Sequence, residues 1–244
     1  MREKKLDKRK AQGAETKKKL YEIAERLFTE CNFSDVNVED ITDEAGITKG
    51  AFYVHFESKD ALIAILIADH AARADADYKS FLESLPDDIP ASEVLLALTQ
   101  KIAETLLNTI GYENMKKVYQ MLLAGTVDTE AVKGYSRELY TLFYGVLEKG
   151  IRRGELISSL PLEELSRHFV MAIRGVSYEW CVRYPDFDLR ERAMEHIRLL
   201  IEGLCTQMAE QAGQMGVEFM KQSNQTVNDI LRDGNYVCGT ATNL

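Results

Sequence analysis

Proline is scarce in this chain, at four residues out of 244. Because proline interrupts helices and interior strands, its scarcity permits long unbroken elements. Long glycine- and serine-rich tracts, which indicate flexible linkers, are also absent. Apolar residues recur at helical spacing, and no segment shows the strict alternation of a half-buried strand. We therefore predict an all-α protein with short connections.

Cysteine is equally scarce. Cys31, Cys181, Cys205 and Cys238 lack the paired spacing of a disulfide framework or a zinc site, and the four histidines add no ligand pattern. We interpret the cysteines as reduced thiols of a cytoplasmic protein and expect no metal.

Long hydrophobic runs are missing too. No stretch of about 18 apolar residues is present, so we expect no membrane-spanning helix and no membrane partner. The N-terminal segment is charged and has no apolar centre, so we do not expect it to be a secretory signal.

Catalytic signatures are absent as well. The sequence contains no phosphate-binding glycine loop, no nucleophile elbow and no HExxH pattern. The acidic pairs Asp87-Asp88 and Glu163-Glu164 lie at predicted loops or helix starts, where carboxylates commonly cap helices. We predict a protein without catalytic residues or a cofactor, and not an enzyme.

Charge is present but unevenly placed. The segment 1–20 holds nine Lys or Arg and three Asp or Glu, a net charge of +6. The segment 21–244 holds the other 21 Lys or Arg and the other 36 Asp or Glu, a net charge of −15. Positive charge that attracts a polyanion is therefore confined to one end. This end is either a solvated tail or an arm that lies over phosphates.

Apolar periodicity predicts a series of helices. The first runs from about 15 to 31, and two middle helices end at Gly111 and Gly125. Longer helices are predicted at 129–152, 161–184 and 188–211, and a weaker pattern lies at 217–231.

Local signals divide the segment from 37 to 62 into short helices. Asn37 is a good N-cap for a second helix that Gly46 ends, and Thr48 can cap a third helix running to Val54 or His55. Ser58 can cap a fourth helix, from Lys59 to about Leu82. Two short helices joined by a turn with glycine form a helix-turn-helix, whose second helix lies in the DNA major groove.

Two aromatic residues decide which side of the third helix faces outward. Phe52 and Phe56 are four residues apart and share a face, so we expect both to be buried. The outer side then carries small residues and hydrogen-bond donors, which suit bases and phosphates: Thr48, Lys49, Gly50, Tyr53 and His55.

The stretch VEDITDEAGITKGAFYVHFESKDAL, residues 38–62, resembles the TetR family of bacterial transcriptional regulators. The resemblance covers about residues 14–65 and rests on many positions in register. One departure is Ala61, where the family often has Glu; its absence removes a capping box but leaves the Ser58 cap.

The resemblance implies a set of DNA contacts. Base edges or nearby phosphates would meet the N-terminus of the third helix, and phosphates would meet the remaining donors. The implied residues are Thr48, Lys49, Gly50, Tyr53, His55 and Lys59. Packing remains an alternative for Tyr53 and His55, and solvated charge remains an alternative for the two lysines.

The resemblance also implies a domain organisation. We expect a disordered basic arm at 1–14, a three-helix helix-turn-helix DNA-binding domain at 15–60, and a helical effector-binding and dimerisation domain at 61–212. The tail at 213–244 could contain a short helix. The helices at 161–184 and 188–211 would pair in a homodimer that reads a near-palindromic operator in double-stranded DNA.

The effector implied by the resemblance is a small, largely apolar molecule. Methionine and aromatic side chains suit an adaptable apolar pocket, although the same residues could simply form the core. The candidates are Met115, Tyr119, Met121, Leu122, Tyr144, Phe169 and Tyr178. His168, Arg174 and Glu179 could add polar contacts, or they could lie at the dimer surface or in ion pairs.

We expect a sequence-specific transcriptional regulator, a repressor that a small-molecule effector releases from its operator. Two alternatives stay open: an activator, and a non-regulatory or architectural DNA-binding protein of the same fold.

Overall fold

The structure, a computed structural model, describes the backbone of residues 2–205 and the side chains of residues 10–205. The all-α prediction is confirmed over this range. Apart from one isolated bridge, between Leu156 and Cys205, the described part contains no strand pairing. The elements are α1 (Arg2–Glu30), α2 (Val38–Ala45), α3 (Lys49–His55), α4 (Lys59–Ser84), α5 (Ala91–Thr105), the π-helix η1 (Leu106–Ile110), α6 (Tyr112–Ala124), α7 (Glu130–Lys133), α8 (Glu138–Arg152), α9 (Leu162–Arg183) and α10 (Leu189–Glu202).

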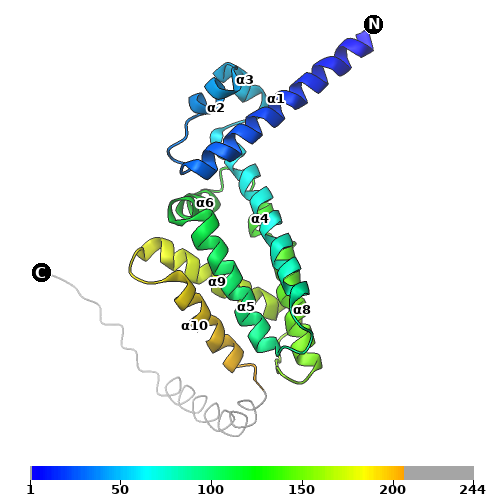
Figure 1. Ribbon diagram of the computed structural model, residues 1–244, viewed down its shortest axis with the longest axis vertical. Coiled ribbons are helices and arrows are strands. Elements are labelled where there is room, and N and C mark those ends of the chain that lie inside the picture. Colours follow the sequence, from blue (N-terminus) through cyan, green and yellow to red (C-terminus); the bar gives the residue numbers. More distant parts are fainter. Residues whose placement is uncertain (1, 206–244) are drawn as a thin grey trace, which may run out of the picture.

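The head consists of α1, α2, α3 and residues 59–67 of α4, and it occupies one end of the long axis (Figure 1). Its apolar core joins side chains from all four helices, and burial of such side chains is the main stabilising term in folding. The most deeply buried members are Leu20, Ala24, Ile41, Phe52, Leu62 and Ile63.

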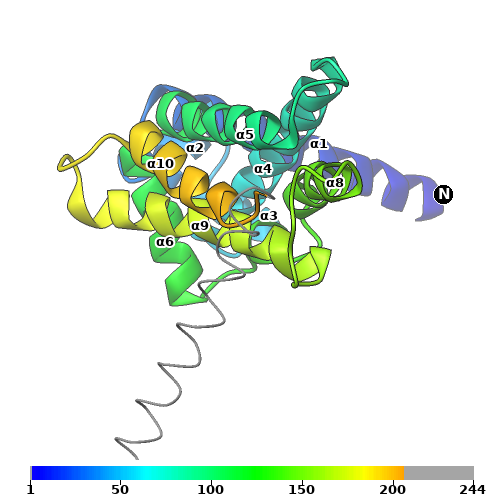
Figure 2. The same cartoon turned by 90° about the horizontal axis from the view of Figure 1, so that it is seen from below.

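The body consists of the rest of α4 together with α5 and α8 to α10. In Figure 2, α5, α9 and α10 lie beside one another, and a second core fills the space between the body helices. Its fully buried members include Leu95, Leu98, Phe143, Leu147 and Phe169. Helix α4 contributes to both cores, so it passes from the head into the body as one continuous helix.

Helix α6 lies between the head and the body (Figure 1). Its residues Val118 and Met121 are buried in the head core. Tyr112 and Met115 of the same helix pack against a third cluster, centred on Trp180 of α9. Helix α6 therefore contacts both halves of the chain through different residues.

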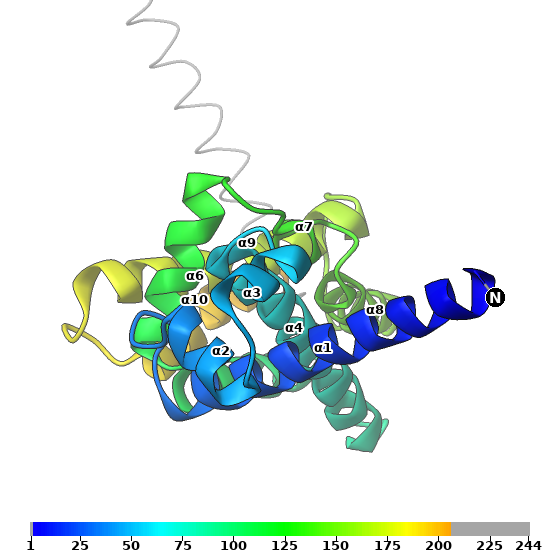
Figure 3. The same ribbon diagram turned by 90° about the horizontal axis from the view of Figure 1, so that it is seen from above.

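The first helix is longer than predicted. Helix α1 is continuous from Arg2 to Glu30, so the arm at 1–14 is helical over its described part rather than disordered. Lys, Arg, Glu, Gln and Ala dominate this segment, and all of them favour helix. The hydroxyl of Thr16 also donates to the Gln12 carbonyl at 2.9 Å, a contact that spans residue 15, the predicted start of the first helix. Figure 3 shows the N-terminal part of α1 running beyond the rest of the molecule.

The helix predicted at 129–152 is interrupted. It divides into α7 and α8 at Gly134, where a Cβ atom would stand only 2.6 Å from the Glu130 carbonyl oxygen. The helix predicted at 161–184 is confirmed as α9, whereas α10 ends at Glu202. The rest of the 188–211 prediction, from 206 onward, and the weak pattern at 217–231 lie outside the described residues.

No helix in the range 2–205 is both long enough and apolar enough to cross a bilayer.

Candidate functional site

The turn before α3 is fixed by local capping. Asn37 and Asp40 form a capping box at the start of α2, and Gly46 ends that helix in the left-handed region at φ 67°. The Oγ1 atom of Thr48 accepts a hydrogen bond from the Ala51 N–H at 3.2 Å and caps α3. Phe52 and Phe56 then anchor α3 in the head core, as the sequence predicts.

The outer face of α3 has few packing partners. Thr48, Lys49 and Gly50 are exposed, and the Tyr53 side chain is 49% exposed. The Tyr53 ring meets the buried Phe52 ring edge-on, at 5.3 Å between centroids. Tyr53 therefore packs on one side and presents its other side to solvent.

Lys49 is held by an acidic neighbour that sequence reasoning missed. Its ammonium forms an ion pair and hydrogen bond with the Glu39 carboxylate on α2. This hydrogen bond raises the pKa of Lys49 and lowers the pKa of Glu39. Lys49 is thus charged and exposed, and in this structure its ammonium is turned toward Glu39.

Lys59 has backbone partners that sequence reasoning missed, and its predicted phosphate contact stays a prediction. Its Nζ atom donates to the carbonyl oxygens of Phe33 and Val36, both at 2.7 Å. Partial burial, followed by the nearby charge of Lys117, lowers the pKa of Lys59. The ammonium already satisfies two carbonyl groups in the loop before α2, so we assign it to holding that loop.

The His55 ring lies near α1. Its Cε1 atom stands 3.9 Å from the position that a side-chain carbon on Gly13 would occupy. Lys17 of the same helix lies 5.4 Å above the Phe56 ring. This arrangement supports the packing interpretation of His55, and its predicted contact with the DNA backbone stays a prediction.

The predicted effector residues are not brought together. Met121 is buried in the head core and Leu122 packs against it, whereas Phe169 lies in the body core 5.7 Å from the Phe143 ring. Met115 packs against the third cluster. The prediction of one pocket from these residues is therefore wrong for Met121, Leu122 and Phe169.

Tyr119, another of the predicted effector residues, links α6 to α9. Its hydroxyl donates to the Arg174 carbonyl at 2.9 Å and lies 2.7 Å from the Ser177 hydroxyl. Burial raises the pKa of Tyr119 to about 12. Its ring meets the ring of Tyr178 edge-on at 5.3 Å, and Tyr178 itself is partly exposed. Tyr144 on α8 is half-buried.

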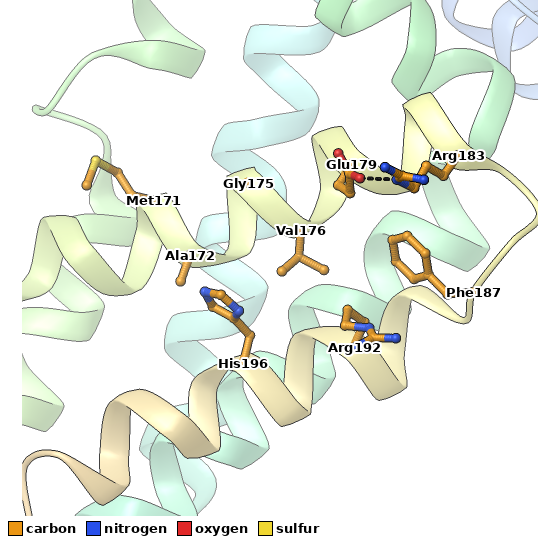
Figure 4. A pocket seen from close by; sticks show the side chains of 9 residues that line it. All are labelled: Met171, Ala172, Gly175, Val176, Glu179, Arg183, Phe187, Arg192 and His196. Atoms are coloured by element: carbon orange, nitrogen blue, oxygen red, sulfur yellow. Dashed lines mark hydrogen bonds and ion pairs between the residues drawn. The ribbon is translucent and has the colours of Figure 1, made fainter.

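Among the described residues, the body has two grooves near the end of α9, and none of the seven predicted residues lines either of them. The first, which we name the α9–α10 groove, has a volume of about 450 Å³. Figure 4 shows side chains from both helices along it. Its lining residues are Met171, Ala172, Gly175, Val176, Glu179, Arg183, Phe187, Arg192 and His196.

The second groove, which we name the aromatic groove, has a volume of about 390 Å³. Tyr112 of α6 stacks on Tyr184 at 4.0 Å, and Trp180 meets both rings edge-on. Its lining residues are Leu107, Tyr112, Trp180, Tyr184, Pro185, Phe187, Asp188 and Leu189. Sequence reasoning missed this groove because its walls come from two distant parts of the chain, η1 with α6 and the connection from α9 to α10.

The sequence signature of bacterial regulatory proteins of the tetR family matches residues 20–65, which span most of the head. The HTH-type transcriptional regulator YdgC of Bacillus subtilis is 32% identical over 139 residues, which cover 52% of this chain and 71% of YdgC. The chain belongs to the TetR family.

Other members of the TetR family are similar over greater length. The HTH-type transcriptional repressor BepR of Brucella suis is 28% identical over 205 residues, which cover 80% of this chain and 94% of BepR. The structure of the TetR family transcriptional repressor FadR of Thermus thermophilus, solved with lauroyl-CoA, matches with a TM-score of 0.60 at 21% identity. That match covers 77% of this chain and 94% of FadR. This TetR protein is therefore a DNA-binding transcriptional regulator.

Proposed function

We propose that this TetR regulator is a homodimeric repressor that a largely apolar small molecule releases from its operator. One observation carries the proposal: α3 presents an exposed outer face while two buried phenylalanines hold its inner face in the head core. The relative BepR is named a repressor, which supports repression over activation.

The contacts with DNA follow from the exposed residues of α3. Thr48, Lys49 and Gly50 would approach bases and the nearest phosphates, and the half-exposed Tyr53 would donate its hydroxyl to a phosphate. Lys49 would exchange Glu39 for a phosphate. Solvent screens an exposed ion pair of this kind, so the exchange costs little.

Replacing Gly50 with alanine should separate DNA binding from stability. A Cβ at this position meets only the Thr48 Oγ1 atom, at 3.8 Å, so the free protein accommodates it. The unfolding free energy should stay the same or rise by less than about 1 kcal/mol. If α3 approaches the bases closely, the added methyl should lower operator affinity about tenfold, or about 1.4 kcal/mol.

Fluorescence anisotropy with a labelled operator measures the effect of Gly50→Ala. Gly145→Ala is the matched control, because Gly145 on α8 is exposed and a Cβ there meets nothing within 4 Å. Equal operator affinity for wild type and Gly50→Ala would contradict the close approach of α3.

The proposed dimer contact is a row of exposed residues along α9. Met171, Gly175, Tyr178 and Val182 recur at spacings of four, three and four, and all four are exposed. The opposite face of α9 already packs in the body core. A two-fold axis would bring this row against its copy, and the same contact would cover the α9–α10 groove.

The proposed effector site is the aromatic groove. Its volume lies within the usual range for small-molecule sites, and four of its eight lining residues are aromatic. The Lys116 ammonium lies 5.7 Å above the Tyr112 ring and 3.9 Å from the Glu113 carboxylate, so it would exchange this exposed partner for an anionic group of the ligand. A ligand with an apolar chain and an anionic group fits this surface. The lauroyl-CoA complex of FadR shows that the same fold accommodates a molecule of that kind.

Helix α6 would transmit the ligand's presence to the head. Besides its contacts with α9, α6 reaches the head through Asn114, whose Oδ1 accepts from the Phe33 N–H at 3.0 Å. Lys117 of α6 also pairs with Asp60 of α4 at 2.9 Å. A ligand changes DNA affinity only if its own affinity differs between two conformations of the protein, here two placements of α6 relative to the head.

Acyl-CoA should release the regulator from DNA through this groove. We expect lauroyl-CoA, added to the protein–operator complex, to lower the anisotropy of labelled operator, while free CoA does not. Tyr184→Ala removes a half-exposed ring from the groove and should raise the lauroyl-CoA concentration needed for release about tenfold, or about 1.4 kcal/mol.

Tyr135→Ala is the control for Tyr184→Ala, because Tyr135 is also an exposed aromatic but lies outside both grooves. Release that is equally sensitive in wild type and Tyr184→Ala would contradict this site. Failure of both lauroyl-CoA and shorter apolar acids to release DNA would contradict the proposed ligand class.

A further inference from the structure

The face of α3 opposite Phe52 carries two residues in one row. An α-helix turns 100° per residue, so Gly50 and Val54, four apart, lie one above the other. Phe52, midway between them, points to the opposite side and is fully buried. Gly50 and Val54 therefore form the outermost line of α3, with Lys49 and Tyr53 along one flank.

Val54 is exposed without a packing role. Its side chain is 79% exposed, the highest value among the large hydrophobic residues of the described range. Valine is also a weaker helix former than alanine or a straight-chain residue, because its branched side chain loses rotamer freedom in a helix. Neither burial nor helix propensity therefore explains a valine at position 54. This position lies on the outermost line of α3, which faces away from the head.

We propose that Val54 is a specificity-determining residue that contacts the 5-methyl group of a thymine in the major groove. The proposal rests on the proposed function, in which the outer face of α3 enters that groove. Among the four bases, only thymine carries an apolar group, its 5-methyl, on the major-groove edge. Small apolar side chains contact this methyl group. An isopropyl group can bury that methyl but cannot hydrogen-bond, so Val54 would favour thymine over cytosine.

Gly50 makes the contact geometrically possible. Because it has no side chain, the first turn of α3 can approach the base edges closely, and Val54 follows one turn later on the same line. The flanking Lys49 and Tyr53 are placed for phosphates on one side. Valine thus meets the base pairs, while the charged and hydroxyl groups meet the backbone.

The test compares thymine with uracil, which differ only by the 5-methyl group. Preferred duplexes are first selected from a random pool with wild type, and each thymine in them is then replaced singly by uracil. We expect one thymine per half-site whose replacement lowers wild-type affinity about fourfold, the effect of losing one buried methyl. In Val54→Ala the same replacement should change affinity by less than twofold.

Ile157→Ala is the matched control, since Ile157 is an exposed aliphatic residue outside the head. It should keep the wild-type response to uracil, and circular dichroism should show that neither variant melts appreciably below wild type. The proposal would be overturned if uracil lowered duplex affinity equally in wild type and Val54→Ala. It would also be overturned if no thymine-to-uracil replacement changed the affinity of wild type. If wild type selects no duplex at all, the proposed function itself fails, a result distinct from selection without a role for Val54.

Discussion

Replacing Gly175 with arginine is expected to convert the dimer into a monomer and to remove specific operator binding. Gly175 lies in the middle of the exposed row on α9, and a Cβ there meets nothing within 4 Å in the single chain. Arginine is also a better helix former than glycine, so the protomer should fold normally. In a two-fold contact, however, the two guanidinium groups would be buried close to each other without partners.

The cost of two unpaired charges in an interface is several kcal/mol, so the dimer dissociation constant should rise at least about 100-fold. Light scattering after size-exclusion chromatography measures the mass directly. Gly145→Arg serves as the control, because it places the same side chain on an exposed glycine of α8. A dimer that survives Gly175→Arg at micromolar concentration would place the interface elsewhere.

Asp75→Ala is expected to cost about 3–5 kcal/mol of unfolding free energy, the usual cost of breaking a buried ion pair from one side. Asp75 on α4 is 3% exposed and accepts two hydrogen bonds from Arg137, at 2.7 and 2.9 Å. It also accepts from the Leu139 N–H at 3.3 Å, at the start of α8. Without the carboxylate, the largely buried Arg137 guanidinium loses its partner.

Urea unfolding at a fixed protomer concentration gives the value, since association with a second copy would add to apparent stability. Asp77→Ala is the control on the same helix, because the Asp77–Lys101 pair is more exposed and should contribute about 1 kcal/mol or less. The double variant Asp75→Leu/Arg137→Met should recover most of the loss. A loss below about 1 kcal/mol for Asp75→Ala would show that the pair does not hold α4 to α8.

The features that could be predicted from the sequence depend on neighbouring residues. The caps at Asn37, Thr48 and Ser58 and the left-handed turn at Gly46 all form as expected. Each involves groups that are close together in the sequence, a side chain and a backbone group at the caps and backbone groups alone at Gly46, so composition and spacing are sufficient. The burial of Phe52 follows in the same way, because its helix is too short to have a second apolar face.

The features that could not be predicted depend on which distant segments meet. Helix α6 has apolar residues on more than one side, and periodicity cannot say that Met121 joins the head core while Met115 packs near α9. The carbonyl partners of Lys59 belong to the loop before α2, so two helices separate them from Lys59 in the sequence. Val54 is different, because its spacing of four from Gly50 and two from Phe52 already predicts the outer face, and only the extent of its exposure comes from the structure.

The central claim is that the outer face of α3 reads a specific DNA sequence in a dimer. Selection of bound duplexes from a random pool, in the presence of excess non-specific DNA, tests it most directly. The account predicts enrichment of a near-palindrome, with two half-sites whose centres are about one helical turn or a whole number of turns apart. A pool that stays random after repeated selection, although the protein is folded and dimeric, would contradict it.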